Sequence, residues 1–206
     1  CHPPMKVSTG SQGQLLEIER LSIPDVLVIK PKRHRDVRGF FSETYKRREL
    51  AAAGIELDFV QDNHASSVER GTIRGLHFQI PPFEQTKLVR VTRGAIFDVA
   101  LDIRQGSPSY GQHVSTIISA ENWRQILVPA GFAHGYCSVD RDTEVIYKVT
   151  GYYSPEHERG VLWNDPALGI DWPVPDAEAI VSGKDGENPV LGDLPDYFDY
   201  KPMVNG

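Results

Sequence analysis

Three side chains that can move or stabilise a proton lie in segments that read as β-strands. His77 stands in GTIRGLHFQ, Lys87 in TKLVRVTRG and Tyr147 in EVIYKVTGYY. Side chains alternate between the two faces of a strand with a period of two. Lys87 and Tyr147 each share a face with two valines, and His77 shares a face with Gln79. The pattern predicts that the three groups, from different strands, point into one small barrel that can hold a single ligand.

Each of these groups also has a purely structural interpretation. An imidazole with a pKa of about 6.5 can act as a general base. A half-buried His77 can equally be held by a backbone carbonyl. Lys87 could extend its ammonium group to the barrel rim, and Tyr147 could simply pack its ring and hydrogen-bond its hydroxyl. The alternation of side chains leaves these alternatives open.

The elements that must position these groups are short strands. From Val26 onward, segments rich in β-branched and aromatic residues recur between Gly, Pro, Asp or Asn, and no long helical pattern intervenes. This organisation predicts an all-β sandwich or barrel. One helix is predicted at 46–53, with Gly54 as its C-cap, and loops with short helical turns are predicted after Trp163. The predicted strands cover residues 26–29, 39–45, 59–66, 71–79, 86–94, 95–103, 113–119, 125–131, 133–139 and 144–153.

Composition narrows the class of protein. The 206 residues, of which 40% are hydrophobic, suffice for one globular domain, which we expect at 21–206. Residues 1–20 are expected to be a loose N-terminal extension or an expression remnant. A net charge of −6 argues against nucleic-acid binding. With two cysteines and no apolar run near the length of about 20 residues that spans a bilayer, we expect no disulfide framework, no membrane segment and a reducing cytoplasm.

The segment PAGFAHG, which contains His134, resembles the second signature of the cupin barrels. Many cupins bind a metal through this histidine and through a His-x-His pair in the first signature. The chain has Gln79 where the second imidazole of that pair would stand. A primary amide is a poor ligand for a transition metal. We therefore expect no metal, and we expect His134 to be structural or to line the pocket.

A longer series of segments resembles, in order, the dTDP-4-dehydrorhamnose 3,5-epimerase family. The resemblance runs from about Ile23 to Asp185 and implies a cupin-type jelly-roll barrel with a few short helices at its periphery and C-terminus. It also implies a homodimer and no cofactor. The segments are RGFFSETY, FVQDNHASS, GTIRGLHFQ, KLVRV, AIFDVALDIR, GSPSYGQ, ISAENWRQILVPAGFAHGYCSV, YKVTGYYSPEHERGVLWNDPALGIDWP and SGKD.

The resemblance also implies catalytic roles. The family inverts C3 and C5 of a dTDP-linked 4-keto-6-deoxy sugar, so a base and an acid must stand on opposite faces of the ring. By resemblance, His77 is the base, and Asp185 holds its imidazole in the useful tautomer. Tyr147 is the acid on the far face, and Lys87 stabilises the developing oxyanion.

Substrate-binding residues follow from the same resemblance. Arg74 and Arg38 are assigned to the pyrophosphate, because a guanidinium can bond two phosphate oxygens at once. Apart from the resemblance, Tyr153 is expected to form a wall for the thymine or the sugar. Positions that contact the nucleotide in relatives, some of them reaching over from the neighbouring subunit, are Phe41, Glu43, Gln61 and Asn63. The binding set is completed by His134 and by Lys184, which precedes Asp185.

The sequence therefore predicts an isomerase that makes dTDP-4-dehydro-L-rhamnose by metal-free acid–base catalysis. A related enzyme that inverts only one carbon, or a ketoisomerase, could use the same pocket. A barrel that binds a nucleotide sugar without catalysis is the alternative from another class. Such a barrel would keep Arg38 and Arg74 but would not need an acid and a base on opposite faces.

Overall fold

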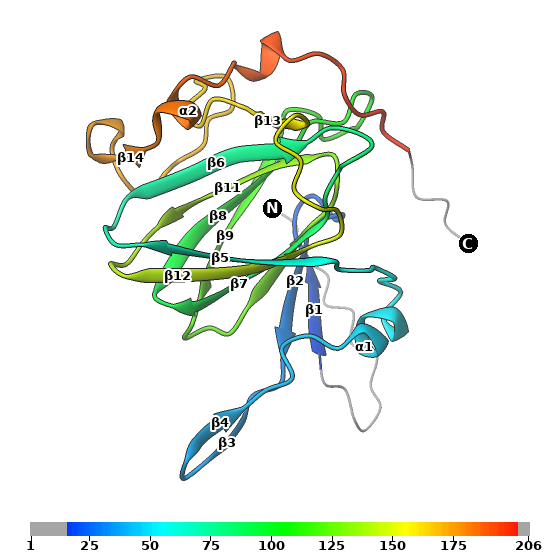
Figure 1. Ribbon diagram of the computed structural model, residues 1–206, viewed down its shortest axis with the longest axis vertical. Helices are drawn as coiled ribbons and strands as arrows, with labels where there is room; N and C mark the ends of the chain where they lie inside the picture. Colours follow the sequence, from blue (N-terminus) through cyan, green and yellow to red (C-terminus); the bar gives the residue numbers. More distant parts are fainter. Residues whose placement is uncertain (1–15, 202–206) are drawn as a thin grey trace.

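The computed structural model describes residues 16–201 as a β-barrel with few helical turns (Figure 1). The strands are β1 (Leu16–Arg20), β2 (Leu27–Pro31), β3 (His34–Asp36), β4 (Gly39–Phe41), β5 (Gln61–Ser67), β6 (Thr72–Gln79), β7 (Lys87–Arg93), β8 (Ala95–Asp102), β9 (His113–Ser119), β10 (Gln125–Val128), β11 (Phe132–Ser138), β12 (Thr143–Val149), β13 (Glu158–Gly160) and β14 (Ile180–Val181). The helices are α1 (Arg47–Ala52) and α2 (Gly183–Gly186), and 3-10 turns lie at Asp176–Glu178 and Leu191–Asp193.

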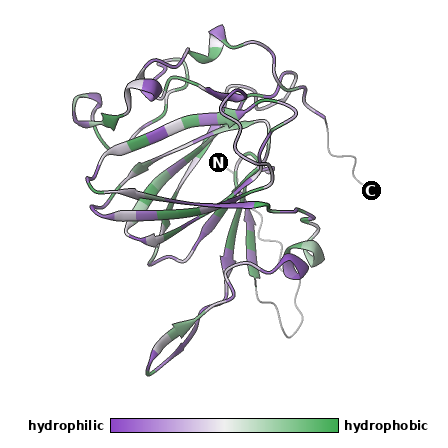
Figure 2. Ribbon diagram, viewed as in Figure 1, coloured by the Kyte–Doolittle hydropathy of each residue, from purple (hydrophilic) through white to green (hydrophobic). Residues whose placement is uncertain are grey.

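Two sheets face each other and form the barrel. The first sheet has the strand order β1-β2-β10-β7-β12-β5, and its pairs are antiparallel. The second has the order β13-β6-β11-β8-β9, and the short strand β14 adds to β6. Apolar and polar residues alternate along barrel strands such as β6 (Figure 2). This architecture confirms the predicted all-β fold.

The core lies between the sheets and on the outer faces of both. Between them, Val89 and Val145 of the first sheet pack with Ile96 of the second, all at most 1% exposed. The outer face of the second sheet is covered by the C-terminal segments, which pack against Leu76 and Val99. Since β8 and β11 are buried on both faces, they are nearly continuous apolar runs.

A β-bulge in β6 decides which of its side chains face the barrel interior. His77 pairs with His134, and Arg74 pairs with Tyr136, so two residues of β6 oppose one residue of β11. Gly75 lies in this bulge with a φ of +122°, and a Cβ there would stand 2.6 Å from the backbone of β11. Side chains three residues apart normally point to opposite faces, but the bulge directs both Arg74 and His77 toward the same cavity.

Strands β3 and β4 form a two-stranded hairpin that extends away from the barrel (Figure 1). We call residues 34–41 the arm. The prediction of one strand at 39–45 was wrong in its extent, because β4 ends at Phe41 and pairs only with β3. Side chains of the arm are exposed, including Phe41 at 68%. The arm therefore makes no contribution to the core of the described chain.

Near both ends of the described chain, the structure can be compared with the organisation that the sequence predicted. Residues 16–20, which were assigned to a loose extension, form β1 and pair with β2, whereas residues 1–15 lie outside the described residues. Helix α1 lies within the predicted 46–53, and Gly54 follows it with a φ of +82°. The part after Trp163 consists of the expected loops and short turns. Among the described residues, no helix is long and apolar enough to cross a membrane.

Candidate active site

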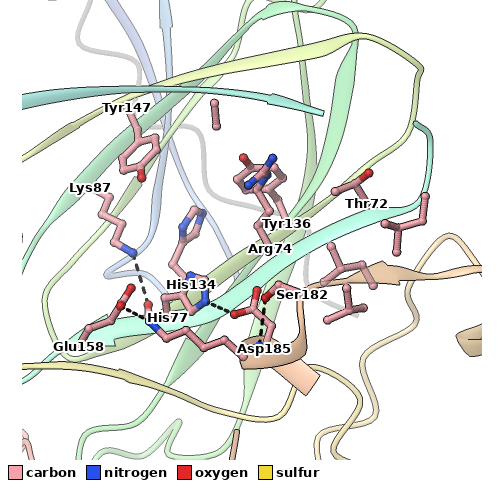
Figure 3. Close-up of a pocket in the computed structure, with 15 residues that line it drawn as sticks. Thr72, Arg74, His77, Lys87, His134, Tyr136, Tyr147, Glu158, Ser182 and Asp185 are labelled. Carbon is pink, nitrogen blue, oxygen red and sulfur yellow. Dashed lines mark hydrogen bonds and ion pairs between the residues drawn. The ribbon is translucent and has the colours of Figure 1, made fainter. Parts of the chain in front are cut away.

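A cavity of about 550 Å³ opens between the two sheets at one end of the barrel (Figure 3). Its walls come from β5, β6, β7, β11, β12 and β13, and the segment from β14 to α2 closes one side. Several of its residues carry groups that can exchange protons or hold charge. These are Arg74, His77, Lys87, His134, Tyr136, Tyr147, Glu158, Lys184 and Asp185.

His77 and Asp185 form a hydrogen-bonded pair on the wall of this cavity. The His77 Nε2 atom lies 2.7 Å from Asp185 Oδ1. Asp185 also accepts a 3.1 Å hydrogen bond from the Gly75 N–H, and its own N–H is capped by Ser182 Oγ. Burial raises the pKa of Asp185, but the bond with His77 and the other bonds outweigh it, so the net pKa is lowered. The carboxylate can only accept, so His77 donates from Nε2 and leaves Nδ1 free to take a proton.

Tyr147 stands on the opposite sheet from His77. It belongs to β12, with Val89 and Asn63 as its neighbours in the first sheet, and its ring packs against the barrel core. Burial raises the pKa of Tyr147 above its usual value, although the charge of Arg74 opposes the shift. The phenol is therefore protonated at neutral pH and faces the imidazole across the cavity (Figure 3).

Lys87 supplies a cation between these two groups (Figure 3). Its Nζ atom donates a 3.4 Å hydrogen bond to the backbone carbonyl of His77. Burial lowers the pKa of Lys87 to about 8, although the carboxylates of Asp98 and Glu158 oppose the shift. The ammonium group is thus poorly hydrated, which strengthens its attraction for a negative charge formed in the cavity.

A second histidine–aspartate pair begins at the wall of the cavity, where His134 lies. The His134 Nε2 atom lies 2.9 Å from Asp98 Oδ2, and the side chain of Asp98 is fully buried. His134, which we expected to be structural or to line the pocket, does line the pocket. Asp98 was missed, although it shares a strand face with the core residues Ile96 and Ala100. A carboxylate on an apolar face was the signal that could have found it.

Gln79 ties together the loop beside the cavity. Its amide nitrogen donates to the carbonyls of Phe83 and Tyr152 at 2.6 and 3.1 Å, and its oxygen accepts from the Ser154 N–H at 2.8 Å. All of these partners are backbone groups. Gln79, which stands where many cupins have a second metal-binding histidine, therefore holds the neighbouring loops in place. Within residues 16–201, no three His, Cys, Asp or Glu side chains are grouped to hold a metal ion.

The outer part of the site is a polar compartment of about 300 Å³. Glu158 lines this compartment, accepts a 2.9 Å hydrogen bond from the Tyr153 hydroxyl and pairs with Lys184. Gln61 donates to Asn63 at 2.8 Å and accepts from the Tyr153 N–H at 3.1 Å. The structure thus brings together four of the predicted binding residues, which are Gln61, Asn63, Tyr153 and Lys184. Glu158 was missed, because the short strand β13 that carries it has no alternating pattern.

Arg74 reaches the cavity from the bulge in β6. Its guanidinium donates to the Ser66 carbonyl at 2.8 Å and to Ser67 Oγ at 3.3 Å. These contacts hold the side chain against β5 and leave further N–H groups for a ligand. The predicted position of Arg74 in the site is supported by this geometry.

Three predicted binding residues are not brought to this cavity. Arg38 and Phe41 lie in the arm, and the Arg38 side chain is 86% exposed and paired with Asp36. Glu43 follows the arm and pairs with Lys46. Within one chain, none of the three lines the cavity around His77, and the hairpin formed by β3 and β4 extends away from the barrel (Figure 1).

The root of the arm is anchored by Trp123. The indole N–H donates a 3.1 Å hydrogen bond to Ser42 Oγ, and the ring meets Phe40 edge-on with centroids 4.8 Å apart. The Arg33 guanidinium lies 4.9 Å from the indole centroid. Trp123 has a φ of +60°, which is unusual for a side chain of this size. The direction of the arm is therefore set by packing at its base.

Comparisons with known proteins point to one family. A family model described as dTDP-4-dehydrorhamnose 3,5-epimerase matches residues 20–193. An enzyme of that name from Sinorhizobium fredii is 48% identical over 191 residues, covering 93% of this chain and 97% of that one. A Legionella pneumophila 3,5-epimerase, solved with dTDP-4-keto-L-rhamnose, has a TM-score of 0.85 and 41% identity, over 90% of this chain and 99% of that one. A 3′-monoepimerase from Streptomyces bikiniensis shares the fold with a TM-score of 0.78 and 33% identity, over 84% and 87%.

Proposed function

The chain belongs to the dTDP-4-dehydrorhamnose 3,5-epimerase family, and from this we propose that it is an isomerase acting on dTDP-4-dehydro-6-deoxy-D-glucose. Inversion at C3 and C5 gives dTDP-4-dehydro-L-rhamnose. The observation that carries the proposal is the placement of His77 and Tyr147 on opposite sheets of the barrel, across one cavity. Epimerisation needs that arrangement, because the proton must leave one face of the carbon and return to the other.

The chemistry follows from the ketone at C4. Its electron withdrawal acidifies the hydrogens at C3 and C5, and Nδ1 of His77 takes one of them as the C–H pair moves into an enolate. The Lys87 ammonium stabilises the negative charge on the C4 oxygen. The Tyr147 hydroxyl then delivers a proton to the opposite face of the same carbon. General acid–base groups of this kind typically contribute about 10²–10⁴-fold each.

Each inversion leaves the protein with an imidazolium and a phenolate. His77 must release its proton and Tyr147 must regain one before the second carbon can react. The cavity is open to solvent through the compartment around Tyr153 and Glu158, which provides a route for this exchange. Protons that enter the product at C3 and C5 are therefore derived from solvent.

We propose that the arm completes the substrate site in a homodimer. Arg38, Phe41 and Glu43 stand outside the cavity of their own chain, and the arm exposes apolar side chains such as Val37. An arm that crosses to a second copy would bring Arg38 toward the pyrophosphate, opposite Arg74 and Lys184. Gln61, Asn63 and Tyr153 would then contact the nucleotide. This arrangement gives the exposed guanidinium and aromatic groups a function.

The alternatives from the sequence differ in how many carbons react. An enzyme that inverts one centre can have the same fold, because the Streptomyces bikiniensis protein that resembles this chain is named a 3′-monoepimerase. The relatives at 44–49% identity are named 3,5-epimerases, which favours inversion of both centres.

A reducing cytoplasm remains the predicted location, and it suits both a nucleotide-sugar substrate and the buried free thiol of Cys137.

The deciding experiment is incubation with dTDP-4-keto-6-deoxyglucose in heavy water, followed by NMR. Deuterium at both C3 and C5, with the L-rhamno product, supports the proposal. Deuterium at one carbon identifies a single-centre epimerase, and a displaced carbonyl identifies a ketoisomerase. Tight binding without any exchange identifies a non-catalytic binding protein.

A further inference from the structure

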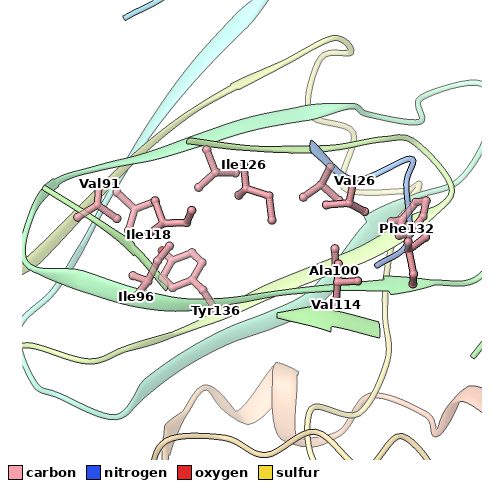
Figure 4. Close-up of a cluster of buried hydrophobic side chains, with 13 residues drawn as sticks. Val26, Val91, Ile96, Ala100, Val114, Ile118, Ile126, Phe132 and Tyr136 are labelled. Atoms are coloured by element: carbon pink, nitrogen blue, oxygen red, sulfur yellow. The ribbon is translucent and has the colours of Figure 1, made fainter. Parts of the chain in front are cut away.

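Tyr136 is a second phenol in the cavity, beside the one assigned as the acid. It stands on β11 opposite Arg74 of β6 and Asp98 of β8. Its ring packs in the barrel core next to Ile96, and the residue is only 5% exposed (Figure 4). The residue nevertheless lines the cavity (Figure 3). The packed ring thus fixes the position of a hydroxyl in the substrate site.

The Tyr136 hydroxyl makes no hydrogen bond to any side chain or backbone group in residues 16–201. Tyr136 lines the cavity, and its hydroxyl is not among the buried unpaired atoms of the described residues, so the group is open to whatever occupies the cavity. Burial raises the pKa of Tyr136 far above its usual value, although Arg74 opposes the shift. The hydroxyl therefore keeps its proton and is available as a hydrogen-bond donor to a ligand.

The position of Tyr136 excludes it as the acid that completes an inversion. Tyr136 and His77 both belong to the second sheet, and their strands β11 and β6 are adjacent. A proton delivered from this side would return to the face from which His77 removed one, which restores the original configuration. Of the two phenols, Tyr147 is the one that stands on the first sheet and approaches the ring from the other side.

The neighbours of Tyr136 indicate which part of the sugar it meets. Tyr136 lies directly opposite Arg74 in the second sheet, and Tyr147 lines the same cavity. In the proposed function, Arg74 binds the pyrophosphate attached to C1, and Tyr147 works at the carbons flanking C4. The carbon between C1 and the reacting C3 is C2, which carries a hydroxyl.

We propose that Tyr136 donates a hydrogen bond to the 2-hydroxyl of the sugar and fixes the rotation of the ring between base and acid. This inference rests on the proposed function, because it requires a sugar with its ketone between the reacting carbons. Tyr136 takes no part in proton transfer. It contributes specificity, since a site built to bond a hydroxyl discriminates against an analogue without it.

The test is Tyr136→Phe, which removes one oxygen and keeps the ring. For the natural substrate, kcat/KM should fall about tenfold, the loss expected for a neutral hydrogen bond in a buried site. For the 2-deoxy analogue, the variant and the wild type should have equal kcat/KM. The melting temperature of the ligand-free protein should stay the same or rise, because the lost hydroxyl has no partner in the protein.

Tyr147→Phe is the matched control, because it should abolish inversion on both substrates while His77 can still exchange protons on its own face of the ring. The inference is overturned if Tyr136→Phe leaves kcat/KM unchanged on the natural substrate, or lowers it equally on the 2-deoxy analogue. A lower melting temperature of the ligand-free variant would also overturn it, since the hydroxyl would then serve the fold. A wild-type protein without exchange would overturn the proposed function as well, so the two failures are distinguishable.

Discussion

The cavity and the arm carry residues assigned to one reaction, yet they are built in opposite ways. In the cavity, His77 is held by Asp185, which is itself fixed by the Gly75 N–H, and side chains pack from both sheets. In the arm, Arg38 and Phe41 are exposed and belong to a hairpin that pairs with no other strand in residues 16–201.

In the proposed function, this difference separates proton transfer, which takes place in the cavity, from the part of substrate binding that is assigned to the arm. Proton transfer needs groups placed within fractions of an ångström, and a barrel wall with fixed partners provides that precision. Binding of a flexible diphosphate tolerates a looser support, and a projecting hairpin can be completed by a second subunit. The comparison predicts that changes in the cavity affect turnover and that changes in the arm affect substrate affinity.

The largest effect is expected for His77→Asn. Removal of the general base should lower the exchange rate at C3 and C5 by at least about 10³-fold. The asparagine amide can still donate to Asp185, so the fold should be retained. Calorimetric titration with dTDP should show near-normal binding, because in the proposed function the nucleotide contacts Gln61, Asn63 and Tyr153 rather than the imidazole. An unchanged exchange rate would remove His77 from its role and, with it, the assignment of chemistry to the cavity.

The next effect concerns the arm. Arg38→Ala should raise KM by about 10- to 100-fold with a smaller change in kcat, as expected for the loss of charge-assisted bonds to a pyrophosphate. If the arm serves the partner, mixing this variant with His77→Asn and allowing subunit exchange should restore activity. Heterodimers contain one intact site, so about a quarter of all sites should recover wild-type kinetics in a random mixture.

Light scattering should confirm a dimer in both variants before they are mixed. Activity equal to the simple sum of the two separate variants would show that Arg38 does not act in the partner's site. The comparison between cavity and arm would then lose its dimeric explanation.

The fold and the inward direction of Lys87 and Tyr147 were predictable because they obey local rules, whereas the roles of His77 and Asp185 were predicted from the family resemblance. Alternation with valines placed Lys87 and Tyr147 on the inner face, and both line the cavity. The prediction for Arg74 could not come from alternation, since regular pairing would turn it away from the face of His77. The bulge at Gly75 depends on close contact with β11, which no local pattern encodes.

Other features depended on pairing between distant segments. Strand β1 has the alternating sequence LEIER, but only its pairing with β2 distinguishes it from the polar residues before it. Strand β13 brings Glu158 to the site through three pairs with β6. Polar and apolar residues do not alternate regularly along the arm. Its shape follows from the packing of Trp123 at its base.

The charge of Lys87 should set an alkaline limit on the activity. Since the pKa of Lys87 is lowered to about 8, the cation is lost as pH rises through this value. The kcat/KM should then fall about tenfold per pH unit above it. Deprotonation of Tyr147 does not cause this fall in kcat/KM, because burial raises the pKa of Tyr147. The kcat profile should break at higher pH, since bound pyrophosphate favours the protonated lysine.

Lys87→Arg tests this assignment, because a guanidinium stays charged throughout the range. The variant should be less active at its optimum, since the planar group fits the cavity differently, but its kcat/KM should show no decline near pH 8. A decline at the same pH in the variant would assign the limb to another group. Profiles of both proteins should be recorded by exchange at C3.

The smallest effect is expected at the base of the arm. Trp123→Asn removes the indole contacts with Phe40 and Arg33 but tolerates the φ of +60°. Aromatic and cation–π contacts of this kind contribute about 0.5–1.5 kcal/mol each, so KM should rise several-fold while kcat changes little. Trp172→Phe is the matched control, because Trp172 packs on the outer face of the second sheet and donates to the Trp163 carbonyl. It should lower the melting temperature and leave KM unchanged. If Trp123→Asn instead lowers the melting temperature as much as the control and spares KM, the indole supports the barrel and the arm is oriented by other contacts.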